Sequence, residues 1–163
     1  MNTISNTAKL GTNVRIGLYS IIEDGVVIGD NTSIGDFCVI RKGAVIGSNC
    51  KFTAYCEIRE GVKIGDHTSF GSRCTISAGA TIGSYTTIKY GFVLTDTPNL
   101  EDGNTKNVGN IGSNVLIGAN VCLMPGVNIA NGAIIGASSQ IRTNVGENEI
   151  WFGNPARFHK IRA

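Results

Sequence analysis

The sequence offers few side chains for acid–base catalysis near neutral pH. Its only histidines are His67 and His159, and His67 follows Gly65-Asp66 at a position typical of a turn. A histidine there is either an ordinary surface residue or, where a second subunit closes over it, a general base. Asp96, in the segment Thr95-Asp96-Thr97-Pro98-Asn99, has a carboxylate that accepts a proton or binds an amine. We therefore take Asp96 and His67 as the candidate catalytic residues.

The elements that position these residues follow a six-residue period. A large apolar residue recurs every six positions from Ile4 to Leu94, and the series resumes from Ile111 to Ile141. Two residues before each one stands a small or β-branched residue, and Gly often follows it. Short strands with two inward side chains, joined by turns that need Gly, Asn or Asp, explain this spacing. The period is too short for helical repeats and predicts an all-β fold, a parallel β-helix.

Most of the cysteines are explained by the same period. Four of the five occupy its small inward position, namely Cys38, Cys50, Cys56 and Cys74. Because buried Cys behaves as a small hydrophobe, packing explains them better than a redox or metal role. Cys122 is out of that register and could face outward, with packing still the favoured role. The odd number of cysteines argues against a secreted disulfide framework.

The period breaks once, between Leu94 and Ile111, where the step is seventeen residues. The intervening residues 95–110 are polar and include Pro98 and Gly103, so they predict a loop that leaves the scaffold. Such a loop is either functional or a solvated excursion. The regularity of the rest of the chain favours a function.

Length and composition limit the remaining possibilities. A chain of 163 residues fits one domain, 1–163, with the loop at 95–110 and a C-terminal tail at 145–163. The net charge of +2 and the lack of a Lys/Arg run argue against a nucleic-acid partner. No apolar segment has the length of a signal peptide or a membrane span, so we expect a cytoplasmic protein without a membrane partner.

Two motifs after the loop carry a more specific signal. IGSNVLIGANVCLMPGV and the terminal GNPAR, at Gly153–Arg157, resemble the second half of hexapeptide-repeat acyltransferases that use acetyl-CoA. The repeat resemblance covers nearly the whole chain. It implies a left-handed parallel β-helix with three hexapeptides in each coil. It also implies a homotrimer, with active sites in clefts between neighbouring subunits that the loop helps to close.

The resemblance also implies where acetyl-CoA binds as the acyl donor. In that family CoA lies along the later coils. The pantetheine arm would then meet backbone groups near Gly118, Ala119, Gly136 and Ala137, and the CoA phosphates would meet Arg142, Arg157 and Lys160. Arg and Lys suit phosphate recognition, although basic residues at a chain end are as often simply solvated. No metal is required.

The kind of acetyl acceptor is predicted from a loop position at which this sequence differs from many relatives. Many relatives that acetylate hydroxyl groups have a His at its start, in the pattern T-x-T-H-P, which deprotonates the hydroxyl. This sequence has none there, which favours an amine, a good nucleophile once deprotonated. The stretch 74–99 also resembles sugar-nucleotide N-acetyltransferases of bacterial surface-glycan pathways. We therefore expect N-acetylation of a nucleotide-linked amino sugar, with Arg73, Tyr90 and Asn99 as substrate-binding residues.

Two alternatives stay open at this stage. One is an O-acetyltransferase, or another small-amine acetyltransferase, with an unusual base. The other is a non-enzymatic structural β-helix, against which the loop and the GNPAR element count. The zinc-dependent carbonic anhydrases of this repeat type are excluded, because they need three His ligands for each metal ion.

Overall fold

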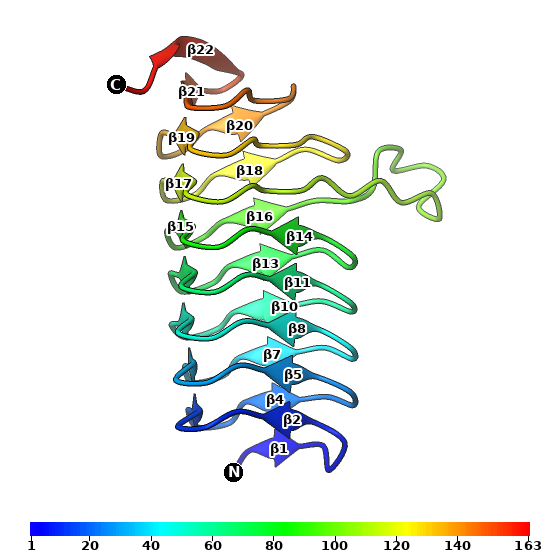
Figure 1. Ribbon diagram of the computed structural model, residues 1–163. Helices are drawn as coiled ribbons and strands as arrows, with labels where there is room; N and C mark the ends of the chain where they lie inside the picture. Colours follow the sequence, from blue (N-terminus) through cyan, green and yellow to red (C-terminus); the bar gives the residue numbers. More distant parts are fainter.

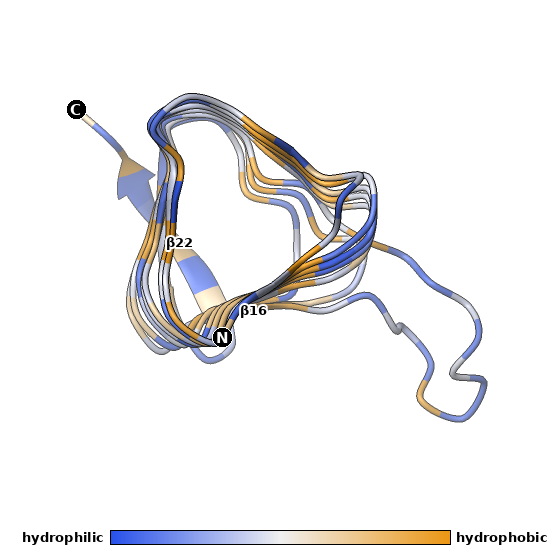
Figure 2. Ribbon diagram, turned by 90° about the horizontal axis from the view of Figure 1, so that it is seen from below, coloured by the Kyte–Doolittle hydropathy of each residue, from blue (hydrophilic) through white to orange (hydrophobic).

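The computed structural model describes residues 1–163 as one three-sided prism of stacked coils without any helix (Figure 1). The chain winds as a left-handed β-helix of about 8 turns, as predicted. Each coil contributes one two-residue strand to each of three parallel sheets, which we call faces 1, 2 and 3. Seen along the axis, the three faces enclose a triangular section, and one loop projects from a corner (Figure 2).

The strands of each face follow one another in chain order. Face 1 contains β1 (Thr3–Ile4), β4 (Ile21–Ile22), β7 (Val39–Ile40), β10 (Glu57–Ile58), β13 (Thr75–Ile76), β16 (Val93–Leu94), β18 (Cys122–Leu123) and β20 (Gln140–Ile141). Face 2 contains β2 (Lys9–Leu10), β5 (Val27–Ile28), β8 (Val45–Ile46), β11 (Lys63–Ile64) and β14 (Thr81–Ile82), continued by single bridges at Ile111, Ile129 and Val145. Face 3 contains β3 (Arg15–Ile16), β6 (Ser33–Ile34), β9 (Lys51–Phe52), β12 (Ser69–Phe70), β15 (Thr87–Ile88), β17 (Leu116–Ile117), β19 (Ile134–Ile135), β21 (Glu149–Gly153) and β22 (Ala156–Ile161).

The register between coils confirms the predicted spacing. Thr3 pairs with Ile21, eighteen residues later, and the same offset recurs along the faces up to the loop. Across the loop, Thr87 pairs with Leu116 instead, so the insertion adds eleven residues without disturbing the stack. A rigid scaffold therefore continues on both sides of the loop and fixes its two ends.

The core is the inward ladder of the six-residue period. The large residues from Ile22 onward are nearly inaccessible, and the small positions between them, such as Val26 and Ala44, are fully buried. Each buried Ile stabilises the fold by roughly 1.5–3 kcal/mol. Only in the first coil does the ladder open to solvent, where Ile4 is 43% and Leu10 is 41% exposed. Stacking of the next coil, rather than the strand itself, buries these side chains.

The cysteines follow the predicted pattern. Cys38, Cys50, Cys56 and Cys74 are free and buried, and Cys122 is half-buried on the outward side of β18. A hydrogen bond with Cys56 and burial raise the pKa of the Cys38 thiol, and burial raises the pKa of Cys50. Thiols in this state pack as small apolar side chains.

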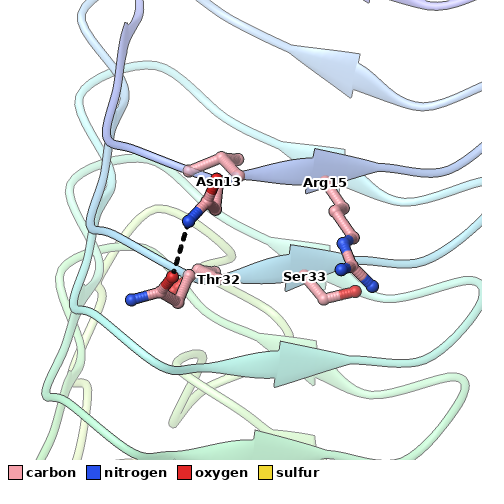
Figure 3. Close-up of a pocket in the computed structure, with 6 residues that line it drawn as sticks. Asn13, Arg15, Thr32 and Ser33 are labelled. Atoms are coloured by element: carbon pink, nitrogen blue, oxygen red, sulfur yellow. Dashed lines mark hydrogen bonds between the residues drawn. The ribbon is translucent and has the colours of Figure 1, made fainter.

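The corners of the prism are columns of residues with left-handed backbone. Between faces 2 and 3 the column includes Asn13, Asn31, Asn49 and His67, each with φ between 56° and 58°. Asn13 Nδ2 donates to the side-chain Oδ1 of Asn31 at 3.3 Å across adjacent coils (Figure 3). Asn tolerates this conformation better than most residues, which explains the turn composition of the repeat.

Two segments depart from the regular prism. Residues 95–110 leave the corner between faces 1 and 2 as an extended loop (Figures 1 and 2). At the other end, β21 continues face 3 and β22 folds back on it as an antiparallel strand, around the GNPAR element. The structure holds no helix that is long and apolar enough to cross a membrane.

Candidate active site

A cavity of about 650 Å³ lies at the base of the loop, on face 1. Its floor is apolar and includes Val93, Leu94 and Met124. Its rim carries the polar groups Arg59, Asp96, Thr97 and Lys106, and Pro98, Leu100 and Pro125 complete one side. The cavity is therefore amphipathic, with a carboxylate and two cations above an apolar surface.

Asp96 is held in this cavity by two neighbours. Thr97 Oγ1 donates to Asp96 Oδ1 at 2.9 Å, and Lys106 Nζ lies 3.5 Å from the same oxygen. Lys106 Nζ also donates to Thr97 Oγ1 at 2.7 Å. The Asp96 side chain is 23% exposed. Because both contacts use Oδ1, Oδ2 has no hydrogen-bond partner within the protein.

The ends of the loop are fixed to the scaffold, which sets the position of Asp96. Thr95 bonds through its backbone and its hydroxyl to the Leu123 carbonyl oxygen of the next coil. The Asn107 N–H donates to the Asp96 carbonyl oxygen at 2.7 Å, and the Gly126 N–H donates to the Asn107 carbonyl oxygen at 2.9 Å. The two strands of the loop neck therefore close on each other, so that Lys106 reaches Asp96.

A second depression, of about 410 Å³, lies on face 3 in the later coils. It is lined by Gly118, Gly136 and Ala137 and by the outward side chains of Leu116 and Ile134, so three of the four residues predicted for pantetheine meet here. Ala119 follows Gly118 directly. An added Cβ at Gly136 would lie 2.7 Å from Phe152 Cβ, so stacking of the next coil already requires a glycine there.

Of the basic residues predicted for the CoA phosphates, Arg157 and Lys160 lie beyond this depression on β22, whereas Arg142 follows β20 of face 1. Phe152, stacked on Gly136, pairs with Arg157 across β21 and β22, and Lys160 pairs with Ile150. Both basic side chains are exposed, as is Arg142, whose Nε donates to Gln140 Oε1 at 2.6 Å. They are free to meet an anion at the C-terminal end of the prism.

A third depression, of about 500 Å³, lies at the corner between faces 3 and 1. Arg73 and Tyr90, both predicted to bind substrate, line it together with Lys89 and Asn120. Lys89 also borders the depression on face 3, so the two depressions are adjacent. Two cations, a phenol and an amide here suit a ligand with a phosphate and hydrogen-bonding groups.

Besides Ala119 and the three basic residues, His67 and Asn99 also lie outside these three depressions. His67 is exposed at the corner between faces 2 and 3, where its ring stacks on Tyr85 with centroids 4.7 Å apart. Asn99 lies out on the loop, and its amide oxygen accepts from the Glu101 N–H at 3.0 Å. A further polar depression in the first coils, beside Asn13, Arg15 and Ser33, contains none of the predicted residues (Figure 3).

Sequence reasoning missed Lys106, Arg59, Lys89 and Asn120. The repeat gives Arg59 and Lys89 the same outward positions as other polar residues, and only the stacking of coils brings them beside a cavity. Lys106 meets Asp96 because the loop neck closes, which no spacing in the sequence indicates. No group of three or more His, Cys, Asp or Glu side chains could hold a metal ion.

Known proteins share parts of this sequence. Two curated relatives match parts of the chain. One is a protein of Lysinibacillus sphaericus named as a macrolide acetyltransferase, and the other is WbbJ of Escherichia coli, named as a lipopolysaccharide biosynthesis O-acetyl transferase. The first is 46% identical over 66 residues, 40% of this chain and 37% of the relative. The second is 42% identical over 50 residues, 31% of this chain and 26% of the relative. The matches thus span well under half the length of either relative.

Solved structures share the fold over nearly the whole chain. A UDP-N-acetylglucosamine acyltransferase of Francisella novicida aligns with a TM-score of 0.73 at 19% identity, covering 98% of this chain and 68% of that one. A mutant of AntD, an N-acyltransferase from Bacillus cereus in complex with dTDP and coenzyme A, aligns with a TM-score of 0.61 at 21% identity. That alignment covers 95% of this chain and 84% of AntD.

The repeats themselves match a described family. Residues 7–42, 25–60, 43–78 and 110–143 match "Bacterial transferase hexapeptide (six repeats)", and residues 61–96 match "Hexapeptide repeat of succinyl-transferase". The matches leave out residues 97–109 of the loop, in keeping with the break in the period. With its stacked coils of six-residue repeats and a polar loop over a cavity, this chain belongs to the bacterial transferase hexapeptide family.

Proposed function

We propose that the protein is an acetyl-CoA-dependent N-acetyltransferase that acts on a nucleotide-linked amino sugar. The observation that carries this proposal is Asp96, a carboxylate held at Oδ1 by Thr97 and Lys106 and open at Oδ2, in a cavity without a histidine. A carboxylate suits an amine, which binds to it as an ammonium ion and needs to lose one proton before it attacks. A hydroxyl acceptor needs a stronger base.

The chemistry assigns one task to Asp96. Its Oδ2 accepts a proton from the acceptor ammonium and orients the free amine. The amine nitrogen then attacks the thioester carbonyl carbon, the carbon–sulfur bond breaks, and the leaving thiolate takes the second amine proton. Backbone N–H groups lining the donor site stabilise the oxyanion. Lys106 acts as a positioning residue, because it contacts Asp96 rather than a reacting atom.

The acyl donor fits the depression on face 3. Its apolar floor at Leu116 and Ile134 suits the methylene groups of a pantetheine arm, and Gly118 and Gly136 line it as well. Arg142, Arg157 and Lys160 are available to the CoA phosphates at the C-terminal end. These residues are suited to the donor whichever acceptor is used.

The donor depression and Asp96 lie on different faces of one prism. Gly91 lies at the corner between faces 3 and 1, and Asp96 lies at the far end of face 1. The five residues from one to the other span roughly 16 Å of extended strand. We therefore propose a homotrimer in which the loop cavity of one protomer faces the donor depression of its neighbour. Such a head-to-tail contact closes into a ring when the rotation fits.

The test is release of thiol from acetyl-CoA in the presence of amino and hydroxyl sugar nucleotides. Turnover is expected with amino sugars, and Asp96→Asn is expected to lower kcat by about 100-fold or more. His67→Ala is measured beside it, because a neighbour's cleft at that corner would make His67 the base. If Asp96→Asn retains wild-type kcat at saturating substrate, the role of Asp96 is wrong.

One observation favours a second function. The matched segment of WbbJ belongs to a protein named for O-acetyl transfer. Turnover with hydroxyl acceptors alone, and none with the matching amino sugars, would establish O-acetylation for this chain and refute the N-acetyltransferase proposal.

A further inference from the structure

The corner between faces 3 and 1 carries a column of stacked side chains. Its left-handed positions, one in each coil, are Tyr19, Phe37, Tyr55, Arg73, Gly91, Asn120 and Ser138. The rings of Tyr19 and Phe37 stack with centroids 5.2 Å apart, and those of Phe37 and Tyr55 stack at 5.0 Å. Arg73 continues the stack, with its guanidinium carbon 6.0 Å from the Tyr55 ring centroid. The column thus presents one planar group for each coil as far as Arg73.

The stack is interrupted at Gly91. Arg73 has Tyr55 on one side, and on the other side the next position has no side chain. The left-handed conformation does not exclude one there, because all six other positions of the column bear side chains at positive φ. The Asn120 amide of the next coil leans into this space, since its Oδ1 would lie 2.3 Å from a Cβ added at Gly91. The amide has no hydrogen-bond partner within the protein, so a ligand can turn it aside.

This gap is the third depression of the candidate site. Arg73, Gly91 and Asn120 line it together with Lys89 and Tyr90. Arg73 and Lys89 form no ion pair in the chain, so their charges are available to an anion. An Arg guanidinium stacks on a planar ring with one face while its N–H groups remain free for phosphate at its edge.

We propose that the gap at Gly91 is a nucleotide site, in which a planar heterocycle stacks on Arg73 and its phosphates meet Arg73 and Lys89. The ring takes the missing place in the column, and the Asn120 amide hydrogen-bonds its edge. The coils on either side set the height of the gap along the prism axis, because each stacked group in the column occupies about 5 Å along that axis. The site then favours a flat ring over a sugar of the same size.

The position of the gap relates it to the proposed acceptor, and to that extent the inference rests on the proposed function. Gly91 and Asp96 lie on the same coil at opposite ends of face 1, roughly 16 Å apart by the rise of extended chain. A nucleoside diphosphate linked to a sugar spans such a distance. With its base at Gly91, the amino sugar reaches Oδ2 of Asp96. The adenine nucleotide of CoA has the same ring and phosphate chemistry and is the other possible source.

The test is binding, measured by calorimetry without turnover. Wild-type chain is titrated with UDP, dTDP and GDP, and with inorganic pyrophosphate as a probe that lacks a ring. Gly91→Asn fills the gap with a side chain that this column already carries at Asn120. It is expected to weaken binding of the preferred nucleotide by about ten-fold or more. A Cβ at Gly91 would lie 2.3 Å from Asn120 Oδ1, so the flexible Asn120 amide must turn aside, whereas the nearest backbone atom lies at 3.7 Å and can stay in place.

Two matched variants separate stacking from charge and from folding. Gly61→Asn makes the same change at another left-handed glycine, with nothing within 4 Å of the added Cβ, and should bind nucleotides like the wild type. Arg73→Lys keeps the charge and removes the planar group, so it should weaken nucleotide binding while leaving pyrophosphate binding unchanged. Equal losses in Gly61→Asn and Gly91→Asn would overturn the proposal. So would nucleotides that bind no more tightly than pyrophosphate.

Further arms identify the source of the nucleotide. If the gap serves the acceptor, Gly91→Asn weakens UDP, dTDP or GDP and leaves CoA binding unchanged. If it serves the donor, the variant weakens CoA but not pantetheine, and the ring site stands with a different occupant. If the chain binds no nucleotide and still transfers acetyl to an acceptor without one, the gap is not a nucleotide site, but the chain is still an acyltransferase. Gly91-dependent nucleotide binding without any acetyl transfer would refute the proposed function alone.

Discussion

Two inactive variants should restore each other's activity if the donor depression and Asp96 face one another across two protomers. Asp96→Asn removes the carboxylate of the loop cavity. Ala137→Trp blocks the donor depression, and because Ala137 is exposed, the larger side chain does not enter the core. In a mixed trimer, the intact loop of one chain meets the intact depression of the other.

The expected recovery follows from the symmetry of the ring. When the two chains mix at random, about three quarters of the trimers contain both, and each mixed ring has one intact site among three. Mixing should therefore return about one quarter of wild-type activity. A site built within one protomer returns nothing, because every chain carries one defect.

The assay is thiol release from acetyl-CoA by the co-expressed variants. The unsorted mixture should show about one quarter of wild-type activity, and assemblies purified in turn through different tags on the two chains, all of them mixed, should show about one third. Sedimentation of each variant alone checks that both assemble like the wild type. Activity of the mixed assemblies no higher than that of either variant alone would refute the argument from the separation of the two sites. Recovery would also be absent if the variants do not mix, and recovering both tags in one complex excludes that case.

Other properties of the fold and the loop are equally testable. Ile76 and Ile4 occupy the same inward position of face 1, but Ile76 is fully buried and Ile4 is 43% exposed. In urea unfolding, Ile76→Ala should therefore lower the free energy of unfolding by about 2–5 kcal/mol, and Ile4→Ala by about 1 kcal/mol or less. Lys106→Met should lower kcat by about ten-fold by releasing Asp96, and Lys106→Arg should recover most of it, measured by steady-state thiol release. Burial raises the pKa of Cys50 and Cys122, so a chromogenic disulfide at pH 8 should label at most the half-buried Cys122 in the native chain and all five thiols in urea. Because the folded pKa of Cys50 is raised, the unfolded thiol ionises first, and the free energy of unfolding should fall as pH rises above about 8.5. Cys50→Ala should make that fall shallower.

Sequence predictions succeeded where a feature depends on residues close together in the chain, and failed where it depends on residues from different coils. The inward ladder and the buried cysteines follow from a period that every coil repeats, so local spacing was enough to predict them. The exposure of Ile4 and Leu10 was not predicted, because their burial depends on a second coil stacked against them and not on their own sequence position. The roles of Asp96, His67 and the other predicted site residues stay predictions for the experiments above.

The sequence by itself determined the scaffold. A six-residue repeat of inward apolar residues has one efficient way to bury them, and the single break marks where the chain leaves the prism. The tertiary structure alone decided which side chains meet. Closure of the loop neck brings Lys106 to Asp96, and stacking of coils brings Arg73, Gly91 and Asn120 into one column. These contacts join residues far apart along the chain, and their geometry comes from the hydrogen-bonded stacking of coils, which the repeat pattern of one coil does not contain.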